Sequence, residues 1–261
     1  MRTTPLHLSL ALILAAAPAV AGPHHHPVRH GARNAQQHAQ TPVTPVTPQA
    51  PQNTPPPPRP LPPPAGQPTA DQVAQQVQGF YDRTTDFQAD FTQVSRNRLY
   101  GREERRTGHV LFKKPGRMRW NYNQPSGDTV VTDGTTLWAY TAEEHQMIQQ
   151  TLAQSQLPSA LTFLAGTGRL TDAFTFRLLD AGSFHFPNGY VLELRPIQPS
   201  PTYDRIVFYV DRATFQIART VLIDAQGNQN RFDFSNPQVN MNVPESTFHW
   251  TPPPGTTVIR P

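Results

Sequence analysis

The sequence predicts a mainly β protein, in which about ten consecutive antiparallel strands curl into a barrel or half-barrel that a few short helices cover. Short stretches alternate apolar and polar side chains with a period of two, which is typical of strands with one apolar face. Turn residues separate these stretches, as in an antiparallel meander. Two segments with helical spacing carry apolar faces, and the open side of a curled sheet is the natural surface for them to cover.

The first predicted element is a helix that begins near Thr69, because Thr69 and Gln72 form a capping-box pattern. Apolar side chains then recur on one helix face: Val73, Val77, Phe80 and Tyr81. Strands are predicted around the alternating segments 87–91, 110–112, 118–122, 137–139, 190–194, 206–210, 217–223 and 232–234. A second helix is predicted from Leu157 or Ser159 to Leu164, with Gly166 and Gly168 ending it.

The most informative strand runs from Arg117 to Tyr122. Met118, Trp120 and Tyr122 face one way, and polar side chains alternate with them. Turn residues lie before this strand at 113–116 and after it at 133–134. We assign four large flat side chains to its apolar face: Trp120, Tyr122, Trp138 and Tyr140. Such a face either packs a core or lines a cavity for an apolar ligand, and the sequence leaves both interpretations open.

The N-terminal segment has the pattern of a secretory signal. Arg2 is followed by an apolar run from Leu6 to Ala17 and by Ala19-Val20-Ala21, a small-x-small cleavage pattern. The run is shorter than the roughly 20 apolar residues that span a bilayer. We therefore expect residues 1–21 to be a cleaved signal peptide and the mature protein to be periplasmic, with an uncleaved anchor as the alternative. The chain has no cysteine, so disulfides are excluded.

Composition separates a linker from a domain. Residues 22–68 hold 15 of the 30 prolines and almost no large apolar side chain, so we expect a disordered proline-rich linker ahead of a domain at 69–261. The formal net charge of +4 comes entirely from four arginines before residue 69, where no acid stands. The remaining 18 basic and 18 acidic residues balance, so net charge gives no case for binding nucleic acid.

Basic residues nevertheless gather in one part of the domain. Residues 96–119 contain nine lysine and arginine residues but only two acidic residues, Glu103 and Glu104. The nine are Arg96, Arg98, Arg102, Arg105, Arg106, Lys113, Lys114, Arg117 and Arg119. One interpretation is a solvated outer face of neighbouring strands. The other is a surface that meets anionic lipid headgroups or an acidic partner.

Signatures of catalysis are missing from the sequence. It contains no Gly-x-Ser-x-Gly elbow, no His-Glu-x-x-His motif and no phosphate-binding glycine loop. The histidines of the domain stand singly, without the spacing of a metal site. We therefore expect a binding protein that is not an enzyme and has neither a metal site nor a cofactor.

Several segments, taken in order, carry a resemblance to a known family. They are Phe87-Gln88-Ala89-Asp90-Phe91-Thr92-Gln93, the glycine-led strand that ends in a basic residue and Pro115, Arg119-Trp120, Thr132-Asp133-Gly134-Thr135-Thr136-Leu137-Trp138, and Thr251-Pro252-Pro253-Pro254-Gly255. Over roughly residues 69 to 258 the chain resembles the periplasmic outer-membrane lipoprotein carrier proteins of the LolA family. The resemblance implies an unclosed, strongly curved antiparallel sheet with helices across its mouth, enclosing a hydrophobic cavity.

The resemblance also implies a function. Such a carrier binds the acyl chains of triacylated lipoproteins, which an inner-membrane ABC transporter releases, and delivers them to an outer-membrane receptor or membrane acceptor. The alternative is a periplasmic sensor or scaffold of the same fold that detects lipid or envelope stress. For a carrier we expect these residues to line the cavity: Phe91, Phe112, Met118, Trp120, Trp138, Leu161, Phe163 and Leu164.

Lys114 is the candidate latch of the lid. The family usually has arginine directly before the strand-breaking proline, whereas this chain has Lys114 before Pro115. Lysine is a flexible point charge and lacks the planar fork of arginine. We expect it to donate hydrogen bonds to backbone carbonyls of the covering helices, and the alternative is an ordinary exposed turn lysine.

Overall fold

The computed structural model describes residues 66–154, 163, 166 and 168–261. Residues 1–65, which hold the predicted signal peptide and nearly all of the predicted linker, lie outside the described part. The predicted helix from Leu157 to Leu164 also lies outside it, apart from Phe163.

Helix α1 spans Ala70–Asp82 and begins as the sequence predicts. The Gln72 backbone N–H donates to the Thr69 side chain, and the Thr69 backbone N–H donates to the Gln72 side chain. This capping box satisfies donors that the start of a helix leaves free. Val73 and Val77 are fully buried, so α1 holds to the sheet by its apolar face.

Twelve strands form one sheet in the part of the chain that the structure describes. The first six are β1 (Asp86–Arg96), β2 (Glu103–Lys113), β3 (Arg117–Tyr122), β4 (Thr129–Asp133), β5 (Thr136–Thr141) and β6 (Gln146–Thr151). The other six are β7 (Phe174–Leu179), β8 (Gly189–Pro196), β9 (Arg205–Asp211), β10 (Ile217–Ile223), β11 (Gln229–Val239) and β12 (Thr257–Ile259). Short helical segments accompany them: η2 (Leu152–Gln154), α3 (Leu170–Ala173) and η3 (Glu245–Phe248).

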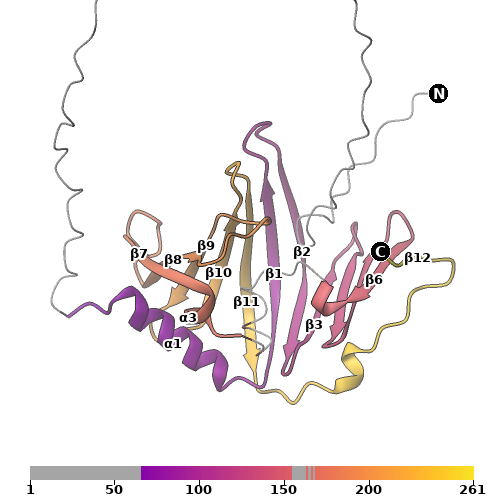
Figure 1. The fold of residues 1–261 in the computed structure, drawn as a ribbon, viewed down its shortest axis with the longest axis horizontal. Coiled ribbons are helices and arrows are strands. Elements are labelled where there is room, and N and C mark those ends of the chain that lie inside the picture. Colours follow the sequence, from indigo (N-terminus) through magenta and orange to yellow (C-terminus); the bar gives the residue numbers. More distant parts are fainter. Residues whose placement is uncertain (1–65, 155–162, 164–165, 167) are drawn as a thin grey trace, which may run out of the picture. The chain divides into compact units, whose positions relative to one another are not determined.

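The sheet is open. Its order is β12-β6-β5-β4-β3-β2-β1-β11-β10-β9-β8-β7, so β12 and β7 lie at opposite ends (Figure 1). Neighbouring strands pair antiparallel, apart from β12, which pairs parallel with β6. The predicted fold class is confirmed in these respects: a mainly β protein, an unclosed antiparallel sheet and few helices. The enclosed cavity stays a prediction.

Strand alternation creates two distinct sheet faces. In β3, Met118, Trp120 and Tyr122 are buried while the residues between them are half-buried, as predicted. Helix α1 packs against β7, β8 and α3 on the face that these buried residues share (Figure 1). We call this the helix-side face, and the opposite one the outer face.

Position 108 in β2 has no room for a side chain, because the backbone of Asn121 and the ring of Phe91 lie too close to it. A Cβ at this position would lie 2.2 Å from the backbone oxygen of Asn121 and 2.6 Å from the ring atom Cζ of Phe91. The Phe91 ring therefore lies over the bare backbone of β2, in the space that a side chain would fill.

Strands β4, β6, β7 and β12 were missed by the sequence analysis. β6 reads Gln-Met-Ile-Gln-Gln-Thr, with only Met147 fully buried, so its polar residues hide the alternation. β12 has three residues, which is too short for a period to appear. Both strands depend on pairing with a neighbour, which a local pattern does not reveal.

Candidate functional site

The helix-side face carries two apolar clusters. The helix cluster joins α1 to β8–β10 and includes Val73, Val77, Tyr81, Leu192, Ile206 and Phe208. The aromatic cluster lies on β1–β5 and β11 and includes Phe87, Phe91, Phe112, Met118, Trp120, Tyr122, Leu137 and Phe232. Leu222 and Phe234 pack against both clusters, so the apolar surface is continuous across the sheet.

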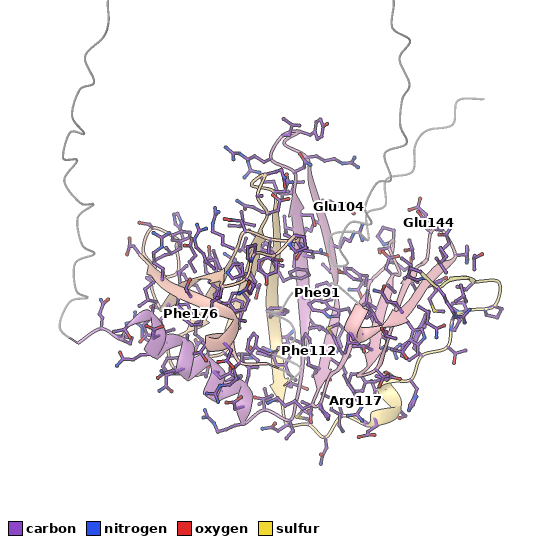
Figure 2. The ribbon with its side chains drawn as sticks, in the orientation of Figure 1. Phe91, Glu104, Phe112, Arg117, Glu144 and Phe176 are labelled. Atoms are coloured by element: carbon purple, nitrogen blue, oxygen red, sulfur yellow. The ribbon has the colours of Figure 1, made fainter. Side chains whose placement is uncertain are left out.

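Four of the predicted lining residues meet in the aromatic cluster. Phe91, Phe112, Met118 and Trp120 are each 2 % exposed. The Trp120 ring is the centre, with ring centroids 4.9 Å from Phe91, 5.9 Å from Phe112 and 5.2 Å from Phe232. Figure 2 shows Phe91 and Phe112 on the neighbouring strands β1 and β2. In this state the four side chains pack against one another.

Trp120 also brings a polar atom into this apolar surface. Its indole Nε1–H is buried and has no hydrogen-bond partner among the described residues. A buried donor without a partner is costly, since it has lost its hydrogen bond to water. Among the described residues, the aromatic cluster therefore contains one buried donor without an acceptor.

Trp138 does not join this cluster, and its assignment to the face of Trp120 is corrected. Trp138 is half-buried and pairs across the sheet with Val131 and Gln149. Its neighbours along β5, Leu137 and Ala139, are the residues in the aromatic cluster. Because the period of a strand is two, Trp138 points to the outer face. Tyr140 shares that face, and its ring centroid lies 5.5 Å from that of Trp250.

Of the three lining residues predicted in the segment 157–164, only Phe163 lies in the described part of the chain. Phe163 is buried in the helix cluster, with ring centroids 5.2 Å from Tyr81 and 6.0 Å from Phe208. Leu161 and Leu164 lie outside the described residues, so their place in the lining stays a prediction.

Lys114 joins the turn after β2 to the end of α1. Its Nζ donates to the backbone oxygens of Tyr81 at 2.5 Å and of Asp82 at 3.3 Å. These are carbonyls at the C-terminal end of a helix, where a cation is favourable. Burial lowers the pKa of Lys114, and the Asp82 charge partly opposes that effect.

The stem of Lys114 makes a further contact. A Cβ at Gly166 would lie 2.7 Å from Lys114 Cδ, and Gly166 has a φ of +75°. Glycine therefore serves twice at this position, by allowing the left-handed backbone and by leaving room for the lysine stem. The predicted contact with helix carbonyls is thus present, and Gly166 adds a second element to it.

The outer face of β2–β4 is covered by the C-terminal segment, residues 240–250. Lys113 Nζ donates to the Val243 oxygen at 2.5 Å, and Arg119 Nη1 donates to the Thr247 oxygen at 2.8 Å. Leu111, Val243 and Phe248 form a small apolar cluster between them. The buried Asp86 carboxylate anchors the start of this segment by accepting the Met241 N–H at 2.7 Å.

This covering segment was missed by the sequence analysis. The signal was present, because Leu111 and Val131 are apolar residues at outward positions of their strands. Outward apolar residues need a partner, but the sequence does not say which segment supplies it.

Within residues 66–154 and 168–261, no three His, Asp or Glu side chains gather closely enough to hold a metal ion. In the described part of the chain, no helix is both long and apolar enough to cross a membrane.

Comparison with known proteins identifies what the chain is similar to. The family described as "Outer membrane lipoprotein carrier protein LolA" matches residues 82–251. An outer-membrane lipoprotein carrier protein of Chromobacterium violaceum is 27 % identical over 195 residues, covering 74 % of this chain and 89 % of that protein. One of Albidiferax ferrireducens is 29 % identical over 183 residues, covering 66 % and 83 %. An uncharacterized conserved protein from Thermus thermophilus has a solved structure with a TM-score of 0.47 and 16 % identity, covering 74 % and 99 %.

Proposed function

Because the chain belongs to the LolA family of outer membrane lipoprotein carriers, we propose that it binds the acyl chains of lipoproteins on the helix-side face and carries them through the periplasm. The observation that carries the proposal is the continuous apolar surface of that face. Its members most suited to acyl chains are Phe91, Phe112, Met118 and Trp120, which are brought together by three neighbouring strands. Acyl chains are apolar and gain about 0.8 kcal/mol for each buried CH₂ group.

Loading requires the aromatic cluster to rearrange. Phe91, Phe112 and Trp120 are buried against one another, so an acyl chain enters by replacing ring–ring contacts with ring–chain contacts. The same rearrangement changes the surroundings of the Trp120 N–H, which has no partner among the described residues. An ester or amide carbonyl at the head of an acyl chain is an acceptor of the kind that this donor lacks.

Lys114 is proposed as the latch of the empty carrier. Support comes from its two hydrogen bonds to the end of α1 and from the packing of its stem against Gly166. These contacts fasten the β2–β3 turn to the segments beside the helix cluster. Releasing them lets the turn and the helix end separate as cargo enters.

The proposed partners lie at both membranes. A lipoprotein-releasing ABC transporter of the inner membrane supplies the triacylated cargo, and an outer-membrane receptor or the membrane itself accepts it. The N-terminal pattern of residues 1–21 supports export to the periplasm.

Photo-crosslinking tests the binding face directly. Benzoylphenylalanine is introduced at Phe91 on the helix-side face or, as a matched control, at Trp138 on the outer face. The purified protein is loaded with an acylated lipoprotein, irradiated and examined by mass spectrometry. We expect a crosslink to the acyl chains from position 91 and none from position 138. Equal crosslinking from both positions, or a crosslink from position 138 alone, contradicts the assignment of the face.

A further inference from the structure

The hairpin of β1 and β2 ends in a structured loop, residues 97–102, which we call the tip. The Asn97 N–H donates to the Arg102 oxygen at 2.9 Å, and the Tyr100 N–H donates to the Asn97 side chain at 3.0 Å. The Arg98 N–H donates to the side chain of Asn228 in the neighbouring β10–β11 turn at 3.0 Å. Figure 1 shows the hairpin reaching beyond the strands around it. The tip therefore has a fixed shape that these hydrogen bonds maintain.

The tip presents two large apolar side chains to water. Leu99 is 81 % exposed and Tyr100 is 78 % exposed, which makes them the most exposed large apolar residues of the described chain. The proposed acyl-binding role does not use them. From the tip, β2 runs about 33 Å to its other end beside Lys114, at about 3.3 Å per residue. The tip is thus remote from the proposed latch.

Unpaired basic residues surround these apolar side chains. Arg96, Arg98, Arg102 and Arg105 are exposed, and none of the described residues forms an ion pair with them. By contrast, the neighbouring Arg106 contacts Glu104 at 2.7 Å and Asp128 at 3.3 Å.

The acids near the tip are mostly engaged elsewhere. Glu104 pairs with Arg106, and the Asp224 carboxylate accepts backbone N–H groups of its own turn from Gln226 and Asn228. Glu103 lies opposite Arg96 in the β1–β2 pair and is the remaining exposed acid at this end of the hairpin. The tip therefore keeps a net positive charge.

A hollow of about 800 Å³ lies beside the hairpin, and its charges differ from those of the tip. Its lining includes four acids, Glu104, Asp128, Glu143 and Glu144, and three arginines, Arg102, Arg105 and Arg106, so Arg102 and Arg105 lie where the hollow meets the tip. Figure 2 shows Glu104 and Glu144 on this side of the sheet. Because four acids face three arginines there, the hollow itself is not basic, and Arg96 and Arg98, which do not line it, keep the end of the hairpin positively charged.

We propose that the tip docks on the surface of an anionic lipid bilayer, with Leu99 and Tyr100 entering the interface and the arginines contacting headgroup phosphates. Tyrosine concentrates at membrane interfaces because its ring is apolar and its hydroxyl is polar. Arginine recognises phosphate by paired hydrogen bonds and by charge. The side chains project from the end of a hairpin, so a soft planar surface accommodates them without a shaped pocket. The proposal goes beyond lipoprotein carriage, because it assigns a membrane-contacting surface outside the acyl-binding face.

Vesicle co-sedimentation tests the proposal with the purified full protein and no lipoprotein. Vesicles of phosphatidylcholine with about one third phosphatidylglycerol are compared with vesicles of phosphatidylcholine alone, at low and high salt. We expect binding to the anionic vesicles that weakens as salt rises, since salt screens surface charge. The double change R96Q/R102Q is expected to weaken binding by about fivefold for each arginine removed. L99S/Y100S is expected to abolish the binding that remains at high salt.

Matched controls separate the tip from general stickiness. R83Q/R169Q removes two exposed arginines elsewhere, and I197S/M241S removes exposed apolar side chains whose exposures are 50 % and 55 %. Both control proteins are expected to bind vesicles as the unchanged protein does. If the tip variants bind as well as the controls, or if the unchanged protein does not bind anionic vesicles, the proposal is wrong.

A fluorescent label gives a second, independent readout. The chain has no cysteine, so Leu99→Cys places a single environment-sensitive dye at the tip, and Ile197→Cys places it elsewhere on the surface. We expect a blue shift on anionic vesicles for the label at position 99 alone. A shift at neither position, or the same shift at both, overturns tip insertion. Neither result bears on acyl carriage, which the crosslinking experiment tests separately.

Discussion

Replacing Lys114 by leucine removes both hydrogen bonds between the β2–β3 turn and the end of α1. The donor is charged, and hydrogen bonds that involve a charged group contribute about 1.5–3 kcal/mol. The bond to the Asp82 oxygen is long at 3.3 Å, and desolvation of the lysine opposes the gain. We therefore assign about 2 kcal/mol to the pair of contacts. A loss of this size raises the population of the separated form about 30-fold.

The effect is expected to stay local. Val73 and Val77 are fully buried in the helix cluster, and the Tyr81 hydroxyl accepts the Ile217 N–H at 3.3 Å. The body of α1 thus remains docked on the sheet when Lys114 is lost. Its last turn and the β2–β3 turn are the parts that loosen.

Hydrogen exchange measured by mass spectrometry checks this expectation. Lys114→Leu is expected to accelerate exchange by about 30-fold in peptides covering 78–86 and to leave peptides covering 240–248 unchanged. Lys113→Leu is the matched control, since Lys113 Nζ donates to the Val243 oxygen on the outer face. It is expected to give the reverse pattern. If exchange at 78–86 is unchanged in Lys114→Leu, or rises equally in both variants, Lys114 does not fasten the helix end.

Transfer assays connect the latch with carriage. Lys114→Leu favours the open form and is expected to retain lipoprotein that is not passed on to acceptor membranes. Lys114→Arg supplies the planar fork and is expected to tighten closure and slow loading. Unaltered loading and release in both variants would assign the latch to another residue.

Three further changes test other parts of the structure. Met118→Glu places a charge on the helix-side face and is expected to abolish acyl binding. Met147→Glu on the outer face, where the side chain is also 2 % exposed, is expected to destabilise folding to a similar extent without a specific loss of acyl binding. Urea titration measures the folding effect, and lipoprotein loading measures the binding effect. Asp86→Ala removes the acceptor that anchors the C-terminal segment and is expected to lower the free energy of unfolding by about 2–3 kcal/mol in urea titration. A loss under about 0.5 kcal/mol would contradict the anchoring role. Deleting residues 22–68 is expected to leave the melting temperature of the domain unchanged in calorimetry, and a fall of several degrees would show that this segment contributes to the fold.

Local periodicity was sufficient to predict much of the sheet. The alternation of Met118, Trp120 and Tyr122 placed three residues on one face, and their burial in β3 agrees with it. The capping box at Thr69 placed the start of α1 within one residue. Such features depend on a few consecutive residues, so a single sequence contains the information that they need.

Faces of different strands are harder to relate than residues within one strand. Trp138 was assigned to the face of Trp120 because both are large and aromatic, but register decides the face. Trp120 pairs with Val130, and Val130 pairs with Ala139, so Trp138 falls opposite. The contact of Lys114 with α1 spans more than 30 residues, and it was expected from family resemblance rather than from spacing.

The packed state of the aromatic cluster bears on how a carrier can release its cargo. An acyl chain of about 15 CH₂ groups gains about 12 kcal/mol on full burial, so three chains would exceed the strongest non-covalent affinities known in proteins. An empty preformed cavity would retain nearly all of that gain. Here Phe91, Phe112 and Trp120 already bury one another, and their mutual contacts are lost when a chain enters. Losing each aromatic pair costs about 0.5–1.5 kcal/mol, and opening the Lys114 contacts costs about 2 kcal/mol more. Both costs reduce the net free energy gained by burying an acyl chain. These losses are smaller than the gain from three fully sheltered chains. Reversible carriage therefore also requires that the chains remain partly exposed, or that further helix-side packing opens with the latch.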